Sequence, residues 1–141
     1  MIKVEKCKKI TTYNDKKIEN GFLQELYKNG EKTLLYLTTI KPGSFKGYHL
    51  HKIREANYVC IKGKVNVILY DISSKRKKEI ILDANNPQKL HIPTYIATGL
   101  ENIGNEEVYL INYPNPPYEP KHLQIGEQVE YTKEDLEKLI K

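Results

Sequence analysis

Short segments rich in β-branched and aromatic residues recur along the chain, with turn-forming residues between them. The segment TLLYLTTI ends at a Lys-Pro-Gly turn, and VNVILYD follows the tight turn Lys-Gly-Lys. Nothing repeats at a fixed period, and no linker-like segment divides the chain. Several short strands with turns between them favour a β-sandwich or barrel over alternating strands and helices. The expected strands span residues 33–40, 56–61, 65–71, 79–83, 89–93 and 108–114.

Helical periodicity occurs once, in the tail YTKEDLEKLIK. Thr132 can cap a helix there, acidic residues fall in its first turn, and Leu136 belongs to an apolar stripe. The pattern predicts a helix over about residues 132–140. We therefore expect one all-β domain over residues 1–141, with its strands over about residues 20–118 and this helix at the end.

The composition is that of an ordinary soluble protein, with 39% hydrophobic and 29% charged residues among 141. No apolar run is long enough to span a bilayer, and the first ten residues lack the apolar core of a secretory signal. We therefore expect a cytoplasmic protein that does not bind membranes. Cys7 and Cys60 form no recognisable pattern, so we expect reduced thiols, with Cys60 in the core.

The net charge of +5 permits an anionic ligand. Much of this charge lies in the segment SSKRKKE, which we interpret as a solvated loop at the tip of a turn. The remaining lysines are scattered and lack an aromatic-rich RNA-binding motif among them, so we expect no binding to nucleic acid.

One motif carries candidate chemistry: His49 and His51 are separated by one residue, and alternation places them on the same face of a strand. With Gly43, Glu55 and Gly63 they resemble the first cupin motif, in which histidines and a glutamate face into a small barrel and commonly bind a metal.

The case for a metal weakens on two counts. The second cupin motif should supply a histidine ligand, and Thr98 stands at its place; a hydroxyl is a poor neutral ligand for iron or zinc. Glu55 is also one residue out of step with the motif, and a slip of one residue turns a strand side chain to the other face. We expect neither a metal nor another cofactor, and keep a metal-dependent cupin as an alternative.

A resemblance to a family covers roughly residues 19–120. The segments ENGFLQE, TLLYLTTIKPGSFKGYHLHK, GKVNVILYD and GLENIGNEEVYLIN are similar in order and spacing to short members of the dTDP-4-dehydrorhamnose 3,5-epimerase family. This resemblance implies a metal-free cupin jelly roll, a nucleoside-diphosphate 4-keto sugar as substrate, and a homodimer with strands exchanged between subunits.

The resemblance also implies a mechanism and its residues. A ketone acidifies the protons on neighbouring carbons, and a histidine with its pKa near neutrality suits their removal. His49, in Lys46-Gly47-Tyr48-His49, stands at the place of the family's base, and Lys46 at the place of a diphosphate contact. The other candidates are Tyr118 as a second catalytic residue, and His51, Tyr58, Tyr109 and Asn112 as substrate-binding residues.

Several helpers of the family's base are replaced. Asn20 stands where the family has an arginine that contacts phosphate, and Thr98 stands where it has a histidine. Ile111 stands where the family has the tyrosine that acts as the acid. No aspartate in the tail matches the one that pairs with the base in the family. Three functions remain open: a 3,5-epimerase with rearranged helpers, a sugar-nucleotide 3,4-ketoisomerase, and a binding protein without catalysis.

Overall fold

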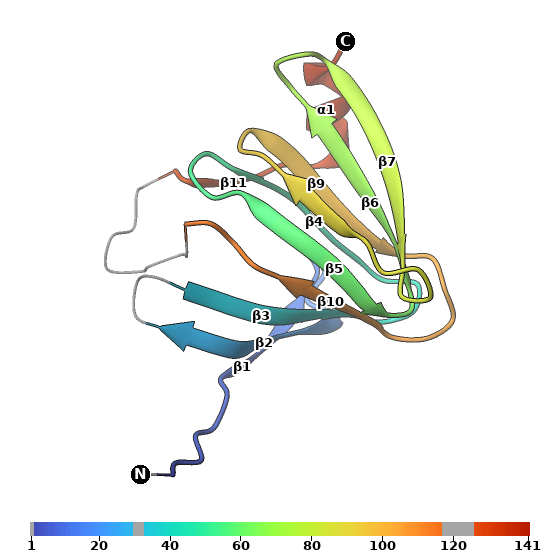
Figure 1. Ribbon diagram of the computed structural model, residues 1–141. Helices are drawn as coiled ribbons and strands as arrows, with labels where there is room; N and C mark the ends of the chain where they lie inside the picture. The colour runs from blue at the N-terminus through green and yellow to red at the C-terminus, as the bar shows by residue number, and fades with distance from the viewer. Residues whose placement is uncertain (1, 30–32, 117–125) are drawn as a thin grey trace.

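The computed structural model describes residues 2–29, 33–116 and 126–141. These residues form two antiparallel sheets packed face to face and one short helix, as Figure 1 shows. The first sheet has the order β1 (Lys9–Tyr13), β2 (Glu19–Asn29), β3 (Thr33–Ile40), β10 (Val108–Asn112), β5 (Ala56–Lys62), β8 (Lys89–Ile92). The second has the order β11 (Gln128–Glu130), β4 (Phe45–His51), β9 (Ile96–Asn102), β6 (Lys64–Asp71), β7 (Arg76–Asp83).

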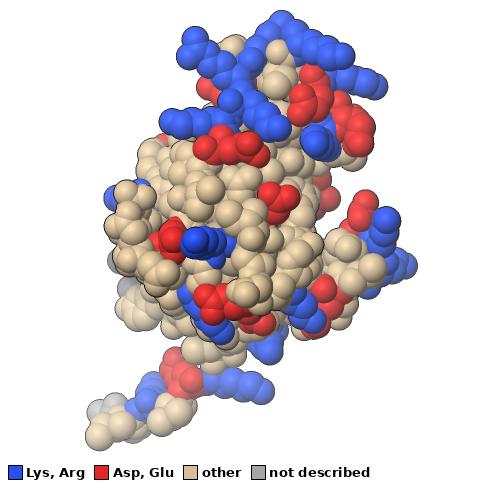
Figure 2. Space-filling model, turned by 90° about the vertical axis from the view of Figure 1, so that its right-hand side faces the viewer, with Lys and Arg blue, Asp and Glu red and all other residues tan. Residues whose placement is uncertain are grey.

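The predicted all-β class is confirmed, and all six expected strands form. The expectation of a loop at residues 73–79 is wrong in part, because β7 begins at Arg76 and the basic residues continue the strand. Their side chains are exposed, which the long β6–β7 hairpin allows. Lysine and arginine gather at the top of the molecule in Figure 2, where this hairpin ends beside the helix.

The apolar core lies between the two sheets. Its fully buried members come from both layers, among them Ile40, Cys60 and Leu110 from the first sheet and Val65 and Val67 from the second. The prediction that Cys60 is a core residue is therefore confirmed, and both cysteines are free thiols.

The outer face of the second sheet is covered by α1 (Lys133–Leu139), which Thr132 caps as predicted. Leu136 is fully buried there against a cluster that includes Tyr48 and Tyr70. The Tyr70 hydroxyl donates a 2.6 Å hydrogen bond to Glu137. Since β11 directly precedes α1, this docking also holds β11 against β4.

The outer face of the first sheet carries partly exposed apolar side chains on β3, β5 and β10, namely Leu35, Leu37, Val59, Tyr109 and Ile111. We call this set the outer apolar face. Residues 2–6 extend away from the sheets without regular structure, with Ile2 and Val4 98% exposed (Figure 1). Within the described residues, no helix is long and apolar enough to cross a membrane.

Candidate functional site

A bulge at Gly47 brings three polar side chains of β4 to one face. Lys46 pairs with Leu100 of β9 while His49 pairs with Thr98, so three steps along β4 match two along β9. Gly47 has φ +134°, and a Cβ there would lie 2.8 Å from the Gly99 Cα. Leu100 faces the core, and paired residues on neighbouring strands share a face, so Lys46 faces the interior. His49 faces it too, because its partner Thr98 is two residues from Leu100. His51 is two residues after His49 and therefore has the same orientation.

A buried carboxylate from the C-terminal tail binds the end of this row. Glu127 is 7% exposed and its Oε2 accepts hydrogen bonds from the backbone N–H groups of Ile53 (3.1 Å) and Arg54 (3.2 Å). Its Oε1 lies 2.9 Å from Arg54 Nε and 3.1 Å from His51 Nδ1. Burial alone would raise the pKa of Glu127, but these donors outweigh it and bring the pKa to about 2.

The hydrogen-bond network assigns a proton position to each histidine. Arg54 Nη2 lies 3.2 Å from Gln128 Oε1, which fixes that oxygen as the acceptor and turns the Gln128 amide nitrogen to His49 Nδ1 at 2.9 Å. His49 Nδ1 therefore accepts, and its Nε2 carries the proton. His51 Nδ1 lies 3.1 Å from both Arg54 Nη2 and Glu127 Oε1, and it can accept from the first or donate to the second but not both. We assign it as the donor to Glu127, because Arg54 already has Glu127 and Gln128 as acceptors, whereas a buried carboxylate needs its donors. The two histidines thus hold opposite tautomers, and only His51 has a free lone pair at Nε2.

Both histidines are kept neutral. Burial lowers the pKa of His49, Glu130 opposes this, and Arg54 and Lys46 lower it further. Burial also lowers the pKa of His51, with Arg54 acting in the same direction and Glu127 against it. Near pH 7 the Nε2 of His51 is therefore available as a base.

Two tyrosines of the first sheet feel the charge of Arg54. Tyr36 accepts a 2.7 Å hydrogen bond from the Asn112 amide, whose oxygen accepts from Asn57 N–H at 3.0 Å. Burial raises the pKa of Tyr36 and of Tyr58, and Arg54 lowers both. The charge of Arg54 thus acts on two tyrosines and two histidines, which places its guanidinium, with 13% of the side chain exposed, among them.

Tyr36 was missed by the sequence analysis. It lies in the expected strand at residues 33–40, in register with Asn112, which was a candidate. Alternation with the core residue Ile40 could have placed it on the interior face of that strand.

Lys46 extends from β4 toward the first sheet. Its Nζ lies 3.0 Å from Thr38 Oγ1 and 3.4 Å from the Phe22 carbonyl oxygen. Burial lowers the pKa of Lys46 to about 8, so the ammonium form still predominates at neutral pH.

The structure brings five of the predicted site residues to the barrel interior: Lys46, His49, His51, Tyr58 and Asn112. Tyr109 is not among them, because Leu110 and Asn112 take the interior face of β10; its ring lies under Lys62 Nζ at 4.9 Å on the outer face. Tyr118 lies outside the described residues. Asn20, at the place of a phosphate-contacting arginine, is buried and instead ties β1 to β4 through Thr12 and the Phe45 carbonyl.

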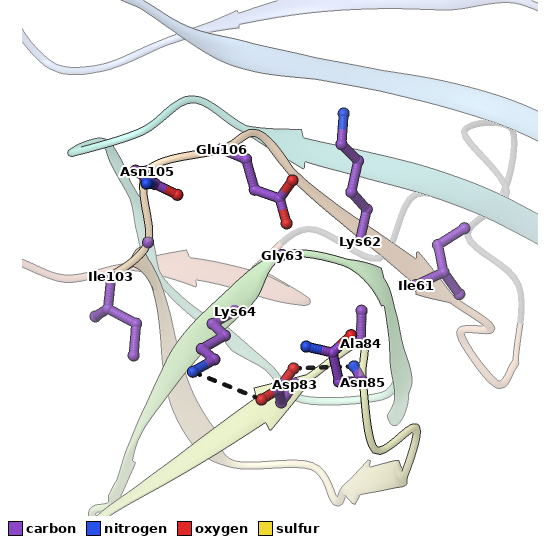
Figure 3. Close-up of a pocket in the computed structure, with 11 residues that line it drawn as sticks. Ile61, Lys62, Gly63, Lys64, Asp83, Ala84, Asn85, Ile103, Asn105 and Glu106 are labelled. Carbon is purple, nitrogen blue, oxygen red and sulfur yellow. Dashed lines mark hydrogen bonds and ion pairs between the residues drawn. The ribbon is translucent and has the colours of Figure 1, made fainter.

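A groove of about 750 Å³ lies at the other end of the barrel, where the turns after β5, β7 and β9 meet (Figure 3). An ion pair between Lys64 and Asp83 crosses its wall. The groove lies near the start of β4, where the Asn102 N–H donates to the Ser44 carbonyl, whereas His51 lies at the end of β4. The groove therefore contains none of the predicted site residues.

Comparison with known protein families assigns the chain to one of them. Residues 15–124 match the model of the family described as the polysaccharide biosynthesis C-terminal domain. The chain belongs to this family. The matched range includes β4 with both histidines and the interior residues of β3, β5 and β10. Glu127 and Gln128 come after the matched range.

Two curated proteins share about a quarter of their residues with this chain. The spore coat polysaccharide biosynthesis protein SpsL of Bacillus subtilis is 28% identical over 130 residues, covering 85% of this chain and 84% of its own. The probable low-salt glycan biosynthesis epimerase Agl13 of Haloferax volcanii is 27% identical over 113 residues, covering 72% of each. Both names place their proteins in polysaccharide or glycan biosynthesis, and the second names an epimerase.

Solved structures confirm the cupin fold. The capsular polysaccharide assembling protein CapF of Staphylococcus aureus superposes with a TM-score of 0.72 at 18% identity over 86% of this chain. This chain spans only 31% of that protein. An oxalate decarboxylase of Bacillus subtilis superposes with a TM-score of 0.63 at 19% identity, over 79% of this chain and 28% of its own.

The oxalate decarboxylase contains Mn(II) centres. In this chain the residues of the cupin-like motif do not form a metal site. Glu55 does not join the histidines, because its carboxylate pairs with His91 Nε2 at 2.9 Å. Thr98 lies beside His49 where a further ligand would be needed. Among the described residues, no group of three His, Cys, Asp or Glu side chains is placed to hold a metal ion. The donor set does not fit a metal.

The depressed pKa of Glu127 predicts a pH-dependent stability. The folded pKa, about 2, lies below the 4.5 of an unperturbed carboxyl, so the stabilisation is complete above about pH 5 and is lost as the pH falls toward 2. At about 1.4 kcal/mol per pKa unit this amounts to about 3 kcal/mol. We expect Glu127→Gln to lose this stability at neutral pH and to flatten the profile between pH 2 and 5, measured by urea unfolding.

Glu130→Gln is the matched control, since the Glu130 side chain is 76% exposed. We expect its unfolding free energy to stay within about 0.5 kcal/mol of the wild type. Equal losses in the two variants would contradict a special role for the Glu127 carboxylate.

Proposed function

We propose that the protein is an epimerase that acts on a nucleoside-diphosphate 4-keto sugar, of the dTDP-4-dehydrorhamnose 3,5-epimerase type. The observation that carries this proposal is the buried Glu127 carboxylate, which fixes a neutral His51 with its Nε2 lone pair free in a cupin barrel. The epimerase name of one relative and the family's role in polysaccharide biosynthesis support the same chemistry.

Inversion begins with removal of a proton beside the ketone. His51 Nε2 takes the proton from C3 or C5, the C–H electron pair forms a C=C bond, and the carbonyl electrons move to the C4 oxygen. Glu127 orients the ring and stabilises the imidazolium that forms. The resemblance gives the base role to His49, but Gln128 occupies His49 Nδ1 and leaves Nε2 protonated.

Inversion ends with a proton delivered to the opposite face of the same carbon. Tyr36 suits this step, because it lies on the other sheet and burial keeps it protonated. Asn112 donates to its oxygen and Arg54 bears a positive charge nearby, so both stabilise the phenolate left behind. Solvent then returns a proton to Tyr36 and accepts one from His51.

A 3,4-ketoisomerase is the second candidate, favoured by one observation. His51 with a free Nε2 and His49 with a protonated Nε2 lie on the same face of β4. One could remove the C3 proton while the other delivers a proton to C4 on the same side, with the O3 hydroxyl proton released and O4 gaining one. This reaction moves the carbonyl without inverting a carbon.

With dTDP-4-keto-6-deoxyglucose in D2O, we expect NMR to show deuterium incorporation at C3 and C5. His51→Ala should slow it at least about 100-fold, because the base is lost. Tyr36→Phe should retain exchange but lose inversion. His91→Ala, at an exposed histidine paired with Glu55, should match the wild type.

Exchange at C3 alone with a new 3-keto sugar would establish the ketoisomerase. No exchange with any nucleotide 4-keto sugar would refute both enzymes and leave a binding protein. Undiminished exchange in His51→Ala, with loss in His49→Ala, would return the base to His49.

We also propose that the protein is a homodimer that buries the outer apolar face defined above. The corresponding face of the second sheet is already covered by α1, whereas this one lacks a cover among the described residues. Residues 2–6 precede β1 at the edge of the same sheet and expose Ile2 and Val4, which suits a second copy exchanging this segment.

Ile111→Asp is expected to give a monomer, because it puts a charge into the buried interface. Light scattering coupled to size-exclusion chromatography measures the mass. Ile81→Asp is the control, since Ile81 is 57% exposed on β7 of the other sheet, and it should remain a dimer. A wild-type protein that is monomeric at all concentrations would contradict the proposal.

A further inference from the structure

We infer that Arg76 and Lys78, near the tip of the β6–β7 hairpin, bind the diphosphate of the substrate. We call these two residues the basic pair. The inference rests on the proposed function, because it takes the substrate to be a nucleoside-diphosphate sugar with its ring at His51. It differs from what the sequence resemblance implies, since the resemblance gives the diphosphate contact to Lys46.

Two other basic residues of the hairpin contact the C-terminal helix. Lys75 Nζ lies 3.3 Å from the Lys141 carbonyl oxygen, and Lys77 Nζ lies 3.8 Å from Glu137 Oε1. Lys77 also pairs across the hairpin with Tyr70, which is buried in the cluster under α1. These two lysines therefore belong to the outer face of the second sheet, which the helix covers.

The basic pair lies on the opposite, interior face of the same strand. Arg76 and Lys78 alternate with Lys77 along β7, and alternation in a strand sends neighbours to opposite faces. The strand register agrees, because Lys78 pairs with Leu69, which packs against the core between the sheets. Both side chains of the basic pair are exposed. The hairpin thus presents two cations to the side of the sheet that holds the histidines.

The charges of the basic pair are not neutralised by an ion pair. In the described part of the chain, no carboxylate forms an ion pair with Arg76 or Lys78. Asp71 pairs with Arg76 across the hairpin and shares its face, but its Oδ1 accepts a 3.2 Å hydrogen bond from the Ser74 N–H in the turn. Two cations therefore stand against one carboxylate, and an anion with several oxygens can bind them.

The strand register joins the basic pair to the histidines. One row of paired residues crosses four strands of the second sheet, and paired residues share a face. The row consists of Lys78, Leu69, Thr98 and His49. Since β7 runs antiparallel to β4, Arg76 lies two residues from Lys78 in the same direction in which His51 lies from His49. The two cations and the two histidines therefore occupy the same level of the barrel interior.

The part of the sheet between them is accessible to solvent. Leu69 and Thr98 are half-buried, and so is Ile96 beyond them. Leu100 and Val67, two residues farther into the barrel on the same strands, are 7% and 0% exposed in the apolar core. The core thus ends below the row of Lys78, and a ligand can lie across the sheet from β4 to β7.

A sugar nucleotide fits the spacing across this surface. β4 and β7 are separated by three strand spacings of about 4.8 Å, or about 14 Å. The diphosphate is attached to C1 of the sugar, which is two bonds from both C3 and C5, so it lies beside the ring from which His51 removes a proton. The long side chains of Arg76 and Lys78 can extend from β7 toward it. A guanidinium donates two parallel hydrogen bonds to a phosphate, and the ammonium adds a point charge.

Lys46 is less suited to the diphosphate. It pairs with the core residue Leu100, and its Nζ lies 3.0 Å from Thr38 Oγ1 and 3.4 Å from the Phe22 carbonyl oxygen on the first sheet. A diphosphate at this ammonium group would bring its charges among apolar core residues and away from water, which is costly. The exposed basic pair binds the same charges without that cost.

The experiment compares two double variants that each remove two positive charges from the same hairpin, Arg76→Gln/Lys78→Gln and the control Lys75→Gln/Lys77→Gln. Calorimetry measures dTDP binding, and steady-state kinetics use dTDP-4-keto-6-deoxyglucose. We expect the first variant to weaken dTDP binding and raise KM at least about 10-fold, with kcat nearly unchanged because the reacting carbons lie at the histidines. The control should stay within about twofold of the wild type, since its lysines face the helix.

An Arg76→Gln/Lys78→Gln variant that binds dTDP as tightly as the wild type would overturn the inference, and a loss in Lys46→Gln alone would return the contact to that lysine. Equal losses in the two double variants would also overturn it, because only the overall charge would then matter. A wild type that turns over no nucleotide 4-keto sugar, but binds dTDP through the basic pair, would refute the proposed function and leave this inference standing. Circular dichroism of each variant checks the fold.

Discussion

The burial of the Glu127 carboxylate is the constraint on which the site depends. A carboxylate removed from water must be compensated by donors, and this one has two backbone N–H groups, the Arg54 guanidinium and the His51 ring. The donors all come from β4 or the turn after it, whereas Glu127 comes from the tail. Folding of the tail and formation of the site are therefore one event, and Leu136, buried under the second sheet, anchors it.

The same constraint sets the protonation of the interior. Arg54 is shared between Glu127 and Gln128, so each histidine meets a different partner and the two rings take opposite tautomers. The interior holds Arg54 and Lys46 as cations against one buried carboxylate, a balance that suits a reaction in which negative charge forms on a substrate. Polar groups thus occupy one part of the barrel interior, and an apolar core fills the space between the sheets beside it.

Much of the fold could be predicted from the sequence, because each strand and turn is indicated by the residues within it. The strand at residues 33–40 and the helix capped by Thr132 formed as expected. β4 and β9 carried weaker signals, since each contains a glycine packed against the other strand. The site was harder to predict. His51 and Glu127 are 76 residues apart, and a three-residue strand brings them together. Only the resemblance placed Lys46 near the base, since alternation would have pointed it away from His49.

The central claim is that the network holds His49 and His51 in opposite neutral tautomers, and two-bond 1H–15N correlation spectra of the histidine rings test it most directly. At about pH 7.5, with resonances assigned by single His→Gln variants, the account predicts a protonated Nδ1 in His51 and a protonated Nε2 in His49. In Glu127→Gln the His51 preference should weaken. A protonated Nε2 in both rings, or a doubly protonated His51 at that pH, would contradict the account.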